Sequence, residues 1–278
     1  MQVFSIDLSV HTSGDSGNVA TLTVYIPDNK CALKDKRPAV VVLPGGGYAH
    51  LADHEGEPVA LRFVGEGACA AVLRYSCTPA RFPQALCEAL TAIRYLRDRA
   101  EEFGIDPKNI AILGFSAGGQ LCGCTGTVWN LPVLTPYLGE DKTPYRPDKM
   151  ILCYPVLSNE GPHHQGSFDC LLGDENELQT AENRKKTCLE YQVGPHTPPA
   201  YLWHTFEDTG VPPIGTIKFA RAMKAHNRIF ELHIYPHGGH GNSMGNHVVR
   251  DRDFNDPMQL NDWVHGAVRF LFDKDLGE

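Results

Sequence analysis

Residues 110–119 read IAILGFSAGG, an apolar run that leads into a serine between glycines. The first four residues have the composition of a buried strand, and the small residues after Ser116 suit the start of a helix. A serine on a sharp strand-to-helix turn is the layout of a nucleophile elbow, which raises the hydroxyl above a sheet. The flanking glycines suit a strained turn against which other chain packs closely. The stretch predicts that Ser116 is activated for acyl transfer and that the amide of Ala117 faces the same space.

The composition is that of an ordinary soluble globular protein. Of the 278 residues, 42% are hydrophobic and 21% are charged. This length is ample for one large core, and we expect a single domain over residues 1–278. The net charge of −8 argues against a nucleic acid or an anionic membrane as partner. No window approaches the roughly eighteen apolar residues of a transmembrane helix. A homo-oligomer is compatible with this composition.

The cysteines and the first residues bear on the compartment. The nine cysteines show no disulfide spacing, and the C-x-C of Cys122 and Cys124 has no second ligand pair of a zinc site. Residues 1–7 lack the basic region and apolar stretch of a signal peptide. Both features predict a cytoplasmic protein.

Short apolar runs alternate with helical patterns from about residue 39 onward. The runs expected to form strands are Val19–Ile26, near the sheet edge, Ala39–Leu43, Cys69–Arg74, Ile110–Leu113, Met150–Tyr154, Ala200–Trp203 and Phe230–Tyr235. The clearest helical patterns run from Pro83 to Gly104, from Ile214 to Ala225 and around Trp263 to Leu271. This alternation predicts an α/β fold with one mostly parallel, doubly wound sheet and right-handed crossovers.

One connection is longer than a crossover requires. Residues 155–198 separate two buried strands and are mostly polar. We expect them to form a short cap-like insertion, with a helix around Glu177–Glu190, that covers the active site.

A glycine run follows the predicted strand Ala39–Leu43. It reads Pro44-Gly45-Gly46-Gly47-Tyr48, and backbone amides there can point at an anion without obstruction by side chains. The amide of Gly46 or Gly47, together with that of Ala117, would form an oxyanion hole. A phosphate-binding loop is the alternative, but the run lacks both the G-K-[ST] ending and the G-x-G-x-x-G spacing.

An acid and a histidine follow two later strands. Asp208 lies just past the predicted strand Ala200–Trp203, and His240 follows the strand that ends at Tyr235. Ligands bind at the carboxyl ends of the strands in such sheets, so all these loops share one edge. The order serine, acid, histidine is that of α/β-hydrolases. We therefore predict Ser116, Asp208 and His240 as a catalytic triad, with Glu207 and His237 as the neighbouring rivals.

Other residues near the predicted site carry weaker signals. Four aromatics, Tyr48, Trp203, Phe206 and Tyr154, could form a platform for a sugar or acyl group, although aromatics beside strands are more often core residues. His50, His54 and Glu55 do not match the H-E-x-x-H pattern of a zinc helix. The sequence predicts no metal site.

With these features in place, the chain resembles the α/β-hydrolase superfamily. More narrowly, it resembles the acetyl-xylan-esterase-like carbohydrate esterases, which are related to the prolyl-oligopeptidase-type and hormone-sensitive-lipase-type esterases. The matching stretches, between about residues 38 and 245, are Pro44–Tyr48, Glu55–Pro58, Phe103–Pro107, Gly114–Gly119, Leu171–Gly173, Thr197–Pro199, Trp203–Thr205, Asp208, Val211–Pro212 and Gly238–Gly241.

The resemblance implies both a triad and an oxyanion hole. The triad roles fall to Ser116, Asp208 and His240, and the oxyanion donors are Gly46, Gly47 and Ala117. Many relatives have His where this chain has Pro44, and many have His-Gly where it has His204-Thr205. Both variants also occur within this branch of the superfamily.

The resemblance also implies an activity. We expect a serine carboxylesterase without metal or organic cofactor that removes small acyl groups, chiefly acetyl, from sugars such as xylo-oligosaccharides. A serine exopeptidase or amidase would use the same triad, but no group that captures a peptide terminus is identifiable. A short-chain lipase would need a more apolar lid than Ser158–Glu190. A binding protein with an inactive triad would be expected to lose some of these residues.

Overall fold

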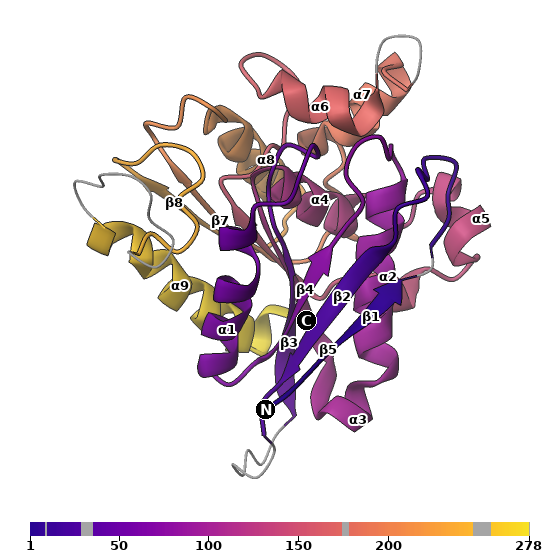
Figure 1. The fold of residues 1–278 in the computed structure, drawn as a ribbon. Helices are drawn as coiled ribbons and strands as arrows, with labels where there is room; N and C mark the ends of the chain where they lie inside the picture. Colours follow the sequence, from indigo (N-terminus) through magenta and orange to yellow (C-terminus); the bar gives the residue numbers. More distant parts are fainter. Residues whose placement is uncertain (9, 29–35, 174–177, 247–256, 278) are drawn as a thin grey trace.

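The computed structural model describes residues 1–8, 10–28, 36–173, 178–246 and 257–277, and within them eight strands form one sheet (Figure 1). In spatial order the strands are β1 (Gln2–Leu8), β2 (Ala20–Ile26), β4 (Cys69–Arg74), β3 (Arg37–Leu43), β5 (Ile105–Phe115), β6 (Lys149–Cys153), β7 (Ala200–Thr205) and β8 (Phe230–Tyr235). Strands β3 to β8 are parallel to one another, whereas β2 pairs antiparallel with both β1 and β4. The predicted mostly parallel sheet is confirmed.

Helices cover both faces of the sheet (Figure 1). On one face lie α1 (Glu57–Gly65) and α9 (Pro257–Phe272), and on the other lie α2 (Gln84–Asp98), α3 (Ala100–Phe103), α4 (Ser116–Thr127) and α8 (Ile214–Ala225). The remaining short helices are α5 (Thr135–Leu138), α6 (Gln165–Leu172) and α7 (Ala181–Thr187).

The continuous apolar runs in the sequence reflect burial on both faces. In β3, Val40 and Val42 pack into the core beneath α1 and α9, whereas Val41 and Leu43 pack into the core beneath α2 and α4. Successive side chains of a strand point to opposite faces, so a strand covered on both sides has to be apolar throughout.

Several elements differ from the sequence-based expectation. β1 forms the sheet edge outside β2, and it was not expected because only Leu8 of this strand is buried and its order comes from pairing with β2. α1 was also not expected. The insertion contains α6 in addition to α7. Within the described residues α7 is shorter than the helix predicted around residues 177–190, and residue 177 itself lies outside them.

The parallel strands direct their carboxyl ends to one edge of the molecule. The loops that leave β3, β5, β7 and β8 there carry the glycine run, Ser116, Asp208 and His240. Helices α6 and α7 lie at the same end (Figure 1). Across the described residues, no helix has both the length and the apolar composition needed to cross a membrane.

Candidate active site

Ser116 is the first residue of α4 and directly follows β5. Its φ of 54° lies in the left-handed region, which is strained for a residue with a side chain. The flanking glycines are required by close approach of the backbone. A Cβ at Gly114 would lie 2.0 Å from the carbonyl oxygen of Gly118, and a Cβ at Gly118 would lie 2.3 Å from that of Leu43. The local geometry is therefore that of a nucleophile elbow.

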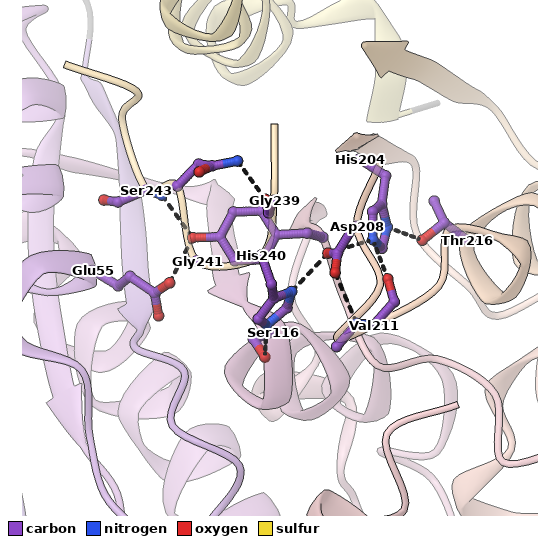
Figure 2. A network of polar contacts seen from close by, with 12 residues as sticks. Glu55, Ser116, His204, Asp208, Val211, Thr216, Gly239, His240, Gly241 and Ser243 are labelled. Atoms are coloured by element: carbon purple, nitrogen blue, oxygen red, sulfur yellow. Dashed lines mark hydrogen bonds and ion pairs between the residues drawn. The ribbon is translucent and has the colours of Figure 1, made fainter. Parts of the chain in front are cut away.

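Three side chains from distant loops form a continuous chain of hydrogen bonds (Figure 2). Oγ of Ser116 lies 2.7 Å from Nε2 of His240, and Nδ1 of His240 lies 2.7 Å from Oδ2 of Asp208. Since the carboxylate only accepts, Nδ1 carries a proton and Nε2 accepts the hydroxyl proton of Ser116. This is the arrangement in which a histidine acts as general base toward a serine.

The carboxylate of Asp208 has further donors that keep it ionised. Its Oδ1 accepts the backbone N–H of Val211 at 2.8 Å, and its Oδ2 lies 3.1 Å from Nε2 of His204. Burial raises the pKa of Asp208, but hydrogen bonds with His204 and His240 outweigh burial and hold the pKa well below its usual range. Asp208 therefore carries a negative charge at neutral pH, which can stabilise a protonated imidazole.

The alternatives to Asp208 and His240 were Glu207 and His237. These two side chains contact each other instead. Their side chains are 53% and 69% exposed and meet at 3.1 Å. Glu207 also accepts the backbone N–H of Gly238 at 3.1 Å. The two residues thus form a separate surface pair.

The glycine run is fixed next to Ser116. A Cβ at Gly45 would lie 3.0 Å from Cβ of Ser116, so this loop runs beside Ser116. The N–H groups of Gly46 and Gly47 have no hydrogen-bond partner among the described residues. Ala117 lies in the first turn of α4, where backbone N–H groups have no partner within the helix. All three amides are therefore available to an anion.

A second polar network lies on the other side of His240 and was missed from the sequence. The carboxylate of Glu55 is buried and accepts the N–H of Gly45 at 2.7 Å and the hydroxyl of Tyr154 at 2.5 Å. The Tyr154 hydroxyl in turn accepts the N–H of Ser243 at 2.8 Å. The pairing depends on the fold alone, because these residues are far apart in the sequence.

No group of three or more His, Cys, Asp or Glu side chains is placed to hold a metal ion within the part of the chain that the structure describes. The carboxylate of Glu55 accepts the amide and hydroxyl donors named above, and its Oε1 lies 3.8 Å from Nε2 of His54.

The predicted aromatic platform needs correction. Trp203 has no solvent exposure and packs on Trp263 and Tyr154, with ring centroids 5.3 and 5.0 Å away. The prediction that Trp203 contacts substrate is wrong, because β7 directs this side chain into the core. Tyr48 and Tyr154 are also buried, with their hydroxyls bonded to Gln120 and Glu55 respectively. Phe206 is 72% exposed, and its contact with substrate stays a prediction.

The insertion brings one histidine to this site. His164 precedes α6, and its Nδ1 accepts the N–H of Ser167 at 3.2 Å. A Cβ at Gly47 would lie 3.8 Å from Cε1 of His164, so the ring faces the glycine run. Burial lowers the pKa of His164, and the charge of the nearby His240 lowers it further.

Comparison with known sequences gives the family context. The BD-FAE family matches residues 22–223. The chain is 34% identical over 220 residues to endo-1,4-beta-xylanase B of Butyrivibrio fibrisolvens, covering 76% of this chain and 33% of that protein. It is 30% identical over 246 residues to an acetylxylan esterase of Xylanibacter ruminicola, covering 87% of this chain and 46% of that protein. The chain thus spans less than half the length of these two relatives.

Solved structures share the fold over most of the chain. The acetyl ester-xyloside bifunctional hydrolase of Caldicellulosiruptor lactoaceticus matches with a TM-score of 0.79 and 35% identity, covering 92% of this chain and 88% of that one. The α/β-hydrolase MGS-M1 from a deep-sea metagenome matches with a TM-score of 0.72 and 30% identity, covering 97% of this chain and 96% of that one. The resemblance to α/β-hydrolases is thereby confirmed.

Proposed function

The chain belongs to the BD-FAE family, and we propose that it is a serine carboxylesterase that removes small acyl groups, chiefly acetyl, from the hydroxyls of sugars. The observation that carries this proposal is the continuous chain of hydrogen bonds from Asp208 through His240 to Ser116. The acetyl-sugar substrate is supported by the names of the relatives, which include an acetylxylan esterase and an acetyl ester-xyloside hydrolase.

The proposed reaction proceeds through an acyl-enzyme. Oγ of Ser116 attacks the ester carbonyl carbon while Nε2 of His240 takes the hydroxyl proton. His240 then gives this proton to the departing alcohol, and the acyl group stays on Ser116. Water, deprotonated by His240, attacks the acyl carbonyl and releases the acid. Asp208 holds the imidazole in orientation and stabilises its charge throughout.

The amides of Ala117 and of Gly46 or Gly47 would hold the oxyanion of each tetrahedral intermediate. Their lack of other partners supports this role, because donors that are already oriented need no rearrangement during the reaction. We also propose that the described part of residues 155–198 covers the site, as the approach of His164 to Gly47 supports.

The first experiment measures hydrolysis of 4-nitrophenyl acetate. We expect turnover by the wild-type protein and loss of about 10⁶-fold in kcat for Ser116→Ala, as for other serine nucleophiles. A Ser116→Ala variant with wild-type turnover would contradict the proposed nucleophile.

The second experiment tests the substrate class. Acetyl, butyryl and octanoyl esters are compared, and acetate release is measured from acetylated xylo-oligosaccharides. We expect the acetyl ester to give the highest kcat/KM and the acetylated oligosaccharide to be hydrolysed. Preference for the octanoyl ester would favour the lipase alternative instead.

A further inference from the structure

Glu55 joins the glycine run to Tyr154, which in turn contacts the loop of His240. Its Oε2 accepts the N–H of Gly45, in the glycine run, at 2.7 Å. Its Oε1 accepts the hydroxyl of Tyr154, directly after β6, at 2.5 Å. The carboxylate is 2% exposed, so both hydrogen bonds lie away from bulk water. Hydrogen bonds to an ionised, buried acceptor are among the stronger ones in proteins.

Tyr154 extends this contact to the loop that carries the catalytic histidine. Its hydroxyl accepts the N–H of Ser243 at 2.8 Å, and its ring packs edge-on against His240 with centroids 5.1 Å apart. Figure 2 shows Glu55 and Ser243 on one side of His240, opposite Asp208. The imidazole thus contacts both Asp208, through Nδ1, and the ring of Tyr154.

The same loops have a second, weaker connection. Nε2 of His54 lies 3.3 Å from the carbonyl oxygen of Gly241, and Oγ of Ser243 donates to the carbonyl oxygen of His54 at 2.8 Å. Both contacts join the segment before α1 to the histidine loop. Neither of these two contacts reaches the glycine run, whereas Glu55 accepts the N–H of Gly45. The carbonyl oxygen of Gly45 in turn accepts the backbone N–H of Ala52 at 3.0 Å.

The backbone is strained where this network meets the loops. Tyr154 and Ser243 have φ angles of 35° and 46°, in the left-handed region. Such conformations are disfavoured for residues with side chains and persist where surrounding contacts fix them. The hydrogen bonds from Glu55 through Tyr154 to Ser243 supply contacts of this kind.

We propose that Glu55 and Tyr154 are positioning residues. They hold the glycine run and the His240 loop at a fixed distance and orientation relative to each other. Neither residue touches substrate. Glu55 fixes the peptide that precedes the amides of Gly46 and Gly47, and Tyr154 fixes the imidazole and its loop. This inference rests on the proposed function, because the loops are those of the proposed esterase site.

The experiment compares Glu55→Gln and Tyr154→Phe with a matched control pair. Each carboxylate oxygen of Glu55 accepts one donor, and in Gln an NH2 group takes the place of one of these two acceptors. Glu57 and Tyr25 form a similar carboxylate–hydroxyl contact of 3.0 Å, so Glu57→Gln and Tyr25→Phe make the same chemical changes outside the Glu55–Tyr154–Ser243 network. Three quantities are measured: kcat and KM for 4-nitrophenyl acetate, the melting temperature, and the rate at which an alkyl fluorophosphonate labels Ser116.

The labelling reaction does not depend on the natural substrate. Oγ of Ser116 forms a bond to phosphorus, fluoride leaves, and His240 takes the hydroxyl proton. The developing negative charge on the phosphoryl oxygen needs the same amides as an ester oxyanion.

We expect Glu55→Gln to lower kcat and the labelling rate by about 10²-fold and Tyr154→Phe to lower them by about 10-fold, with KM little changed, because displacement of catalytic groups by about 1 Å has effects of this size. The double variant should be no slower than Glu55→Gln, since the two residues act as one unit. The control variants should stay within about twofold of wild type. A lower kcat with little change in KM distinguishes a positioning role from a structural one. A purely structural role would lower the melting temperature without changing kcat in the folded protein.

The inference is overturned if the site variants label as fast as the controls, or if their loss of activity disappears when the assay is run well below their melting temperature. Tyr154→Phe keeps the ring and so provides the test if Glu55→Gln does not fold. A wild-type protein that is labelled but hydrolyses no ester would refute the proposed function, while the labelling rates still decide the role of Glu55. A wild-type protein that is not labelled would overturn both.

Discussion

Nε2 of His204 lies 3.1 Å from Oδ2 of Asp208, the same oxygen that contacts His240. Nε2 of His204 also lies 2.8 Å from the carbonyl oxygen of Val211, so both neighbours are acceptors and this nitrogen must carry a proton. Nδ1 then accepts the hydroxyl of Thr216 at 2.9 Å. His204 is fully buried, and it therefore acts as a fixed donor that orients the acid.

Replacement of this donor should affect stability and turnover together. We expect His204→Phe to lower the free energy of unfolding by about 2 kcal/mol, because buried polar groups lose their partner. Turnover of 4-nitrophenyl acetate should fall by about tenfold as Asp208 loses its fixed position. Thr216→Val is the control, since it leaves the contact between His204 and Asp208 in place. Urea unfolding and steady-state kinetics measure both effects, and a His204→Phe protein equal to wild type in both would contradict the assignment.

Replacing each of the adjacent acids Asp208 and Glu207 by its amide tests which of them orients His240. Asp208→Asn should lower kcat by about 10⁴-fold, because an amide favours the wrong tautomer of His240. Glu207→Gln should change kcat by less than about threefold, since a surface ion pair contributes little. Kinetics with 4-nitrophenyl acetate compare the two variants. The reverse order of effects would move the acid role to Glu207.

The lowered pKa of Asp208 predicts a pH dependence of stability. In the unfolded chain this carboxyl titrates near 3.8, and in the folded protein it titrates lower. Between these values the unfolded chain binds more protons, so the stabilisation is complete above the unfolded pKa and is lost as pH falls through the folded one. Unfolding free energies of wild type and Asp208→Asn, measured from about pH 6 down to about pH 3, should therefore converge toward the acid end. A difference that stays constant with pH would show that the titration of Asp208 does not contribute.

Much of this site could be located from the sequence because its parts are tied to strand ends. The runs before Pro44 and Ser116 are apolar throughout, which identifies strands covered on both faces. In a parallel sheet such strands deliver their following loops to one edge. Ser116, Asp208 and His240 were therefore expected to meet, and the structure brings them within hydrogen-bond distance.

The features that the sequence did not reveal depend on contacts between distant residues. The hydrogen bond between Glu55 and Tyr154 joins two loops 99 positions apart, and no local pattern indicates it. Trp203 illustrates a different limit. It ends the predicted strand near the site, but β7 is buried on both faces, so this side chain packs in the core beneath α9. β1 was missed because a mostly exposed edge strand lacks the apolar run that identified the others.

The insertion offers a test of substrate contact through His164. Because Nδ1 of His164 accepts from Ser167, the neutral ring carries its proton on Nε2, and the lowered pKa favours this neutral form. We expect Nε2 to donate to a hydroxyl of the sugar. His164→Asn keeps a side chain that caps α6. It should raise KM for acetylated xylo-oligosaccharides about fivefold, the equivalent of one hydrogen bond, and leave kcat/KM for 4-nitrophenyl acetate within about twofold. His163→Asn, at the adjacent position, should change neither value. An equal effect on both substrates would show instead that His164 supports the catalytic groups rather than the sugar.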